Sequence, residues 1–127
     1  MFSLHHNSFD YGKSWSQPEP FTPNGVYPQL LLLDSGMLIL ASGRPGLQLR
    51  FCIDGDGMTW TEPIEMMPIM NENGNIDVWG RSCGYPYIMP VDSNTLYMVY
   101  SDFKTKDING EYRKSIIFRR IEVIKKP

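Results

Sequence analysis

Apolar and polar residues alternate with a period of two along most of the chain, which is typical of strands that lie half-buried in a sheet. A helical period does not extend beyond one turn anywhere in the sequence. The Pro-rich segment 16–24 suits an outer edge strand or a loop. The sequence therefore predicts a nearly all-β protein, with further strands over residues 2–6, 25–33, 37–41, 47–53, 62–66, 85–91, 95–101 and 114–124.

Two segments of the chain are repeated. GKSWSQP at 12–18 returns as GMTWTEP at 57–63, and Tyr27-Pro28 returns 58 residues later as Tyr85-Pro86. Repeats of this size indicate stacked units, none of which buries its apolar face alone. The expected organisation is the end of a preceding unit at 1–24, a four-stranded unit at 25–66, an inserted loop at 67–83 and a last unit at 84–127 that lacks its fourth strand.

One predicted strand and one polar segment lead to more specific expectations. In the strand at 47–53, Leu and Phe alternate with Gln, Arg and Cys, so one face is expected to be wetter. Residues 104–113 are polar and contain Asn109-Gly110, so they are predicted to form a turn.

Composition excludes several functional classes. Twelve basic and fourteen acidic residues leave a net charge of -2, too balanced for a nucleic-acid binder. The longest apolar run, residues 30–33, is far shorter than the roughly 20 residues of a membrane helix. Cys52 and Cys83 are expected to be free thiols, with one disulfide as the alternative, and their spacing does not suit zinc. No nucleic acid, membrane, metal or cofactor is expected.

Residues 8–15 carry side chains that suit a tight β-hairpin. Ser and Asp side chains can bond the backbone of the turn, Gly supplies a positive φ, and Trp packs beneath the hairpin. The pattern Ser8-x-Asp10-x-Gly12-x-x-Trp15 resembles the Asp-box of the bacterial neuraminidase repeat, which occurs in sialidases and their relatives. This resemblance implies a six-bladed β-propeller, of which the chain would supply about two four-stranded antiparallel blades.

The second hairpin resembles the same box in part. Gly57, Thr59 and Trp60 match, whereas Ile53 and Gly55 stand where the box has Ser and Asp. Asp54 or Asp56 is expected to substitute in the turn. The Trp residues of both hairpins are interpreted as structural.

The features that follow the first hairpin resemble the C-terminal part of sialidases. Arg44 lies in a Gly/Pro turn before a strand, and Tyr85 opens a strand. The resemblance implies that Arg44 is one of three arginines binding the carboxylate of sialic acid and that Tyr85 is the nucleophile. A guanidinium matches a carboxylate in shape, and a phenol attacks beside a carboxylate with less repulsion than Asp or Glu. From the residues alone, Arg44 could also be a surface turn and Tyr85 a core tyrosine.

The inserted loop adds two candidate substrate-binding residues. Trp79 and Arg81 could border a sugar site, because aromatic faces stack on sugars; the alternative is that both anchor the loop. Long loops in compact folds are usually functional.

The resulting expectation is the C-terminal part of a sialidase-like glycoside hydrolase acting on sialic acid or related acidic sugars. In that family the acid/base Asp, the Glu partner of the Tyr and the other arginines precede the matched segments, so the chain alone is expected to be inactive. The alternative is a non-catalytic glycan-binding or scaffolding Asp-box propeller. No export signal is expected in this chain, and the compartment stays open, since the family is often secreted or periplasmic. Open strand edges predict self-association, for example three chains closing six blades.

Overall fold

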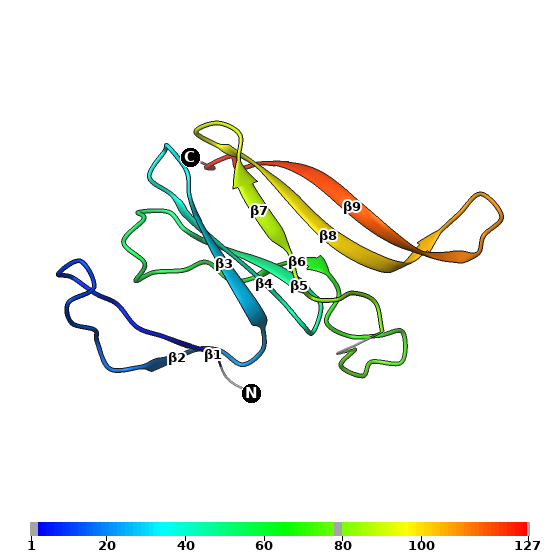
Figure 1. Ribbon diagram of the computed structural model, residues 1–127, viewed down its shortest axis with the longest axis horizontal. Helices are drawn as coiled ribbons and strands as arrows, with labels where there is room; N and C mark the ends of the chain where they lie inside the picture. Colours follow the sequence, from blue (N-terminus) through cyan, green and yellow to red (C-terminus); the bar gives the residue numbers. More distant parts are fainter. Residues whose placement is uncertain (1–2, 78–79, 127) are drawn as a thin grey trace.

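The computed structural model describes residues 3–77 and 80–126, and this part of the chain consists of strands and connecting loops without a helix (Figure 1). The strands form three antiparallel sheets. The all-β prediction is therefore confirmed. The strands are β1 (Ser3–His5), β2 (Glu19–Thr22), β3 (Val26–Leu32), β4 (Leu38–Gly43), β5 (Leu47–Cys52), β6 (Ile64–Met67), β7 (Tyr87–Pro90), β8 (Thr95–Lys106) and β9 (Tyr112–Glu122).

Each sheet is a simple meander in which neighbours in sequence pair. The first sheet is the β1–β2 hairpin, the second has the order β3-β4-β5-β6, and the third has the order β7-β8-β9. Short turns connect β3 to β4, β4 to β5, β7 to β8 and β8 to β9, because antiparallel strands need only a few residues to reverse direction. The connections from β1 to β2 and from β5 to β6 are longer loops. β1 and β2 lie within residues 1–24, β3 to β6 within 26–67, and β7 to β9 within 87–122.

The hydrophobic core lies between the second and third sheets. On the second sheet it includes Ile39, Leu47 and Leu49, which are almost inaccessible to solvent, and on the third sheet Leu96 and Met98. Strands β3 and β7 lie beside each other where the two sheets meet (Figure 1). The two units thus bury one apolar face each against the other, as stacked repeats do.

One expectation about an individual segment is wrong, and another holds only in part. The segment 104–113 is not a turn throughout, because β8 continues to Lys106 and β9 already begins at Tyr112. Its polar side chains are those of a two-stranded arm exposed on both faces, and a bulge between Asp102 and Thr105 separates the arm from the rest of the sheet. The face of β5 that was expected to be wetter is so only at Arg50, which is partly exposed, because Gln48 is 7% exposed and Cys52 is fully buried.

Candidate functional site

Arg44 and Tyr85, the two main candidates from the sequence, are in direct contact. Arg44 follows β4 and Tyr85 precedes β7 by two residues. The Nη2 atom of Arg44 donates hydrogen bonds to the Tyr85 hydroxyl and to the Cys83 carbonyl, each at 2.9 Å. The guanidinium carbon also lies 4.9 Å from the centre of the Tyr85 ring, within the range of a cation–π interaction.

Two glycines allow the segments that carry these side chains to approach. A Cβ on Gly43 would collide with the carbonyl group of Gly84. A Cβ on Gly84 would lie 2.8 Å from the Cβ of Arg44, closer than real Cβ atoms come to such a neighbour, and Gly84 has a φ of +72°. Glycine is therefore required for this crossing of the two backbones.

Tyr27 extends the pair into a cluster of three residues. Its ring lies 5.0 Å from the Tyr85 ring, centre to centre, at 60°. Both tyrosines are about half exposed. Tyr27 and Arg44 have φ values of 52° and 49°, which residues other than Gly rarely adopt, and such strained residues cluster at functional sites. Tyr27 is not among the site residues predicted from the sequence, although the repeat of Tyr-Pro marks it as the counterpart of Tyr85.

Arg81 lies on the loop before β7, which also carries Tyr85, but its side chain is held by Asp102 of the third sheet. Its Nε and Nη2 atoms donate to the two carboxylate oxygens of Asp102 at 3.2 and 3.1 Å. Burial opposes ionisation of Asp102, but the hydrogen bonds from Arg81 and the Lys104 backbone, with the charges of both residues, outweigh it and lower the pKa of Asp102. Trp79, the other candidate in the loop, lies outside the described residues.

The first hairpin, residues 8–15, is organised by its serine and aspartate. Ser8 Oγ accepts a hydrogen bond from the Gly12 backbone and donates to Asp10. Asp10 in turn accepts from the backbone and hydroxyl of Ser14. The hydroxyl and backbone N–H of Ser14, with weaker contributions from hydrogen bonds of Ser8 and Lys13, lower the pKa of the Asp10 carboxyl and outweigh the opposing effect of burial. Trp15 packs near Gly12 but remains largely exposed.

In the second hairpin a thiol stands in the place of the serine hydroxyl. Cys52 Sγ accepts from the Gly57 backbone at 3.3 Å and lies 3.2 Å from an Asp56 carboxylate oxygen, to which it donates. Of the two aspartates expected to substitute in this turn, Asp56 therefore makes the bond, and it also accepts from the Met58 backbone. Trp60 donates to the Gly57 carbonyl. Both cysteines are free thiols, as predicted.

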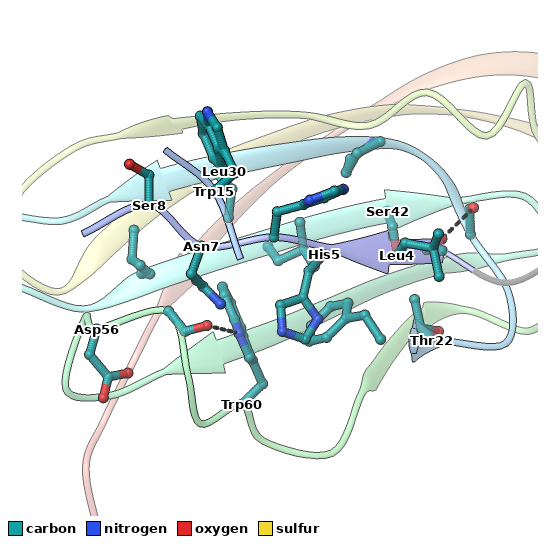
Figure 2. A pocket seen from close by; sticks show the side chains of 18 residues that line it. Leu4, His5, Asn7, Ser8, Trp15, Thr22, Leu30, Ser42, Asp56 and Trp60 are labelled. Atoms are coloured by element: carbon teal, nitrogen blue, oxygen red, sulfur yellow. Dashed lines mark hydrogen bonds between the residues drawn. The ribbon is translucent and has the colours of Figure 1, made fainter. Parts of the chain in front are cut away.

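A groove of about 550 Å³ lies between the β1–β2 hairpin and the second sheet. Figure 2 shows Trp15 and Leu30 on one side of this groove, Trp60 on the other, and Asp56 at one end. The groove is mainly apolar and is separate from the pair of Arg44 and Tyr85, which do not line it.

Searches against family models, curated proteins and solved structures found no match to this chain. Within residues 3–77 and 80–126, no helix is long and apolar enough to span a membrane. The same residues contain no group of three or more His, Cys, Asp and Glu side chains placed to hold a metal ion.

Proposed function

We propose that this chain forms the C-terminal part of a sialidase-like glycoside hydrolase and supplies Arg44 and Tyr85 to a site for sialic acid or a related acidic sugar. The observation that carries this proposal is the contact between the Arg44 guanidinium and the Tyr85 hydroxyl. The two residues are 41 positions apart in the sequence, so their contact depends on the packing of the second and third sheets.

The arrangement of the sheets supports a propeller architecture. We propose that the second sheet is a complete blade, that the β1–β2 hairpin is the outer half of the blade before it, and that the third sheet supplies three strands of the next. The hairpins from β1 to β2 and from β5 to β6 carry the two Asp-boxes at equivalent positions, which such an assignment requires. Stacked antiparallel sheets with short connections are the units of propellers.

The chemistry of the pair suits an acidic sugar. The planar guanidinium can bind the substrate carboxylate through two parallel hydrogen bonds. The same cation stabilises negative charge that develops on the phenol oxygen during attack on the anomeric carbon. In a complete enzyme, the phenol oxygen forms the bond to this carbon as the leaving group departs, and groups outside this chain accept and donate the protons.

The aromatic pair favours a second candidate function, non-catalytic glycan binding. Tyr27 and Tyr85 offer two half-exposed rings beside a cation, and rings of this kind stack on sugars. Binding would then need no turnover. Under this alternative, Tyr85 acts through its ring and its hydroxyl is dispensable.

Titration of the chain with sialic acid, followed by NMR chemical-shift changes, tests the proposed site. The matched ligand is the methyl ester of sialic acid, which has nearly the same shape but no negative charge. We expect the acid to bind in the millimolar range and the ester at least about tenfold more weakly, as expected for loss of a charged hydrogen-bonded pair worth about 1.5–3 kcal/mol.

Two variants distinguish the roles of the residues. Arg44→Lys keeps the charge but removes the guanidinium fork, so it should weaken binding of the acid and leave binding of the ester unchanged. Tyr85→Phe should preserve binding, while abolishing sialoside hydrolysis in any assembly with the complementary blades. Equal binding of acid and ester would refute the proposal. Hydrolysis that survives in Tyr85→Phe would refute the nucleophile and leave glycan binding.

A further inference from the structure

The third sheet has an apolar face that points away from the core. Tyr87, Val99 and Phe118 occupy paired positions on β7, β8 and β9, as do Met89 and Tyr97. These residues alternate along their strands with core residues and therefore lie on the opposite face. Phe118 is 59% exposed, so the face is open to solvent. We call it the outer face, defined by Tyr87, Met89, Tyr97, Val99, Ile116 and Phe118.

The second sheet has an open apolar surface on its opposite side. Leu30, Leu38 and Leu40 line the groove together with residues of the β1–β2 hairpin. The hairpin covers only part of this surface, since Leu30 is 65% exposed and Leu32 60% exposed. We call it the groove face, defined by Leu30 and Leu32 of β3 and their paired residues Leu40 and Leu38 of β4. Figure 2 shows Leu30 at this face.

The repeat shows that these two surfaces are complementary. At the offset of 58 residues that relates Tyr27 to Tyr85, Leu38 and Leu40 of the groove face correspond to Leu96 and Met98. Those two residues form the side of the third sheet that packs against the second sheet in the core.

The same offset relates the outer face to the other side of the core. Ile39 and Ala41 of the second sheet correspond to Tyr97 and Val99. Ile39 and Ala41 are buried in the core between the sheets. An outer face placed on a groove face would therefore continue the internal sheet-to-sheet interface from one molecule to the next.

Charge favours the same pairing. On strand β9, Lys114, Arg120 and Glu122 alternate with the core-side residues and so lie on the side of the outer face, a net charge of +1. Arg113 and Arg119 do not add to it, because Arg113 pairs with Asp107 and Glu111, and Arg119 lies on the core side, where it donates to the Tyr100 hydroxyl. The segments 3–24 and 53–66, which include the hairpins bordering the groove, contain six acidic residues and one basic residue, a net charge of -5. In the described strands, β1 pairs only with β2 and β9 only with β8, so each surface also adjoins an open strand edge.

We infer that two copies of this chain associate head to tail, with the outer face of one packed against the groove face of the next. The contact joins two different surfaces, so every copy can bind two neighbours. Such contacts form a ring when the rotation closes and a filament when it does not. This interaction does not depend on sugar binding or catalysis.

Sedimentation velocity and sedimentation equilibrium of the purified chain test the inference. We expect the average mass to exceed the 14.6 kDa of one chain and to rise with protein concentration. Phe118→Asp on the outer face and Leu30→Asp on the groove face should each shift the protein to the monomer. Ile108→Asp is the matched control, because Ile108 is fully exposed at the tip of the β8–β9 arm and lies on neither surface.

A mixture of the two variants tests the head-to-tail geometry. Phe118→Asp keeps an intact groove face and Leu30→Asp an intact outer face, so an equimolar mixture should form dimers and nothing larger. Circular dichroism spectra matching the wild type establish that both variants are folded. A monomeric wild-type chain, association unaffected by either variant, or a mixture that stays monomeric would each overturn the inference. Association should also weaken between 0.1 and 1 M salt, where the Debye length falls from about 10 to about 3 Å.

Discussion

Replacing Gly84 by alanine tests whether the close approach of two backbones positions Arg44 against Tyr85. A new Cβ at this position would lie 2.8 Å from the Arg44 Cβ and 3.0 Å from its backbone nitrogen. Either neighbour belongs to the backbone or is attached directly to it, so the two segments must move apart. We expect the hydrogen bond between Arg44 and Tyr85 to lengthen or break.

The size of the effect has two parts. An alanine at a φ of +72° costs about 1–2 kcal/mol, because the left-handed region is unfavourable for residues with a Cβ. Overpacking against Arg44 adds about 1–3 kcal/mol. At roughly 4 °C per kcal/mol for a domain of this size, Gly84→Ala should lower the melting temperature by about 8–20 °C.

Gly110→Ala separates the two parts. Gly110 has a φ of +80° in the turn between β8 and β9, and an added Cβ would meet nothing within 4 Å. The free energy of unfolding of Gly110→Ala should fall by only about 1–2 kcal/mol. Urea unfolding followed by circular dichroism, at one protein concentration, measures both variants. Equal losses would refute the close approach, and retained binding of sialic acid by a strongly destabilised Gly84→Ala would refute its role in positioning the site.

Two further perturbations address the loop and the thiols. Asp102→Asn should lower the free energy of unfolding by about 1–2 kcal/mol. This is the contribution of a charged hydrogen-bonded pair, reduced because Arg81 is partly exposed to solvent. Because the pKa of Asp102 is lowered in the folded state, the stability that Asp102 contributes is present at neutral pH. This stability is lost as the pH falls below about 3.8 and through the folded pKa. The unfolding curves of the wild type and Asp102→Asn should therefore converge in acid. An aromatic disulfide reagent should modify the exposed Cys83 quickly and the buried Cys52 only after denaturation, and two fast thiols would contradict the placement of Cys52.

Most of the fold could be predicted from alternation and turn residues. The second sheet illustrates why, since its apolar runs and the Asp34-Ser35-Gly36 turn specify a hairpin without reference to the rest of the chain. The arm formed by β8 and β9 could not be predicted in the same way. Beyond the bulge its two strands are exposed on both faces, so no apolar alternation marks them. The hydrogen bonds that Asp107 accepts from the Asn109 and Glu111 backbone N–H groups are local to the turn.

The candidate site was predictable only in part. Arg44 and Tyr85 were selected through a resemblance, and their contact depends on how two sheets pack, which no local pattern encodes. The role of Cys52 was missed because Gly57 lies five positions after Cys52 in the second hairpin, whereas Gly12 lies four positions after Ser8 in the first. A pattern with fixed spacing places Ile53, and not Cys52, opposite the serine.

The repeat also relates the two polar contacts that hold the loop before β7. At the offset of 58 residues, Arg44 at the end of β4 corresponds to Asp102 in β8. Arg44 bonds to the Cys83 carbonyl and the Tyr85 hydroxyl, and Asp102 bonds to Arg81.

Equivalent positions in the two units therefore carry opposite charges and fasten the same loop at two points. The backbone between them is fixed as well, since the Cys83 N–H donates to Ser101 Oγ and the Phe103 N–H donates to the Arg81 carbonyl. Both attachments act on the short segment 81–85. Asp102 and Arg81 can therefore affect ligand binding without touching the ligand. Their ion pair limits how far Tyr85 can move relative to Arg44, so loosening it in Asp102→Asn should weaken sugar-acid binding while Arg44 remains intact.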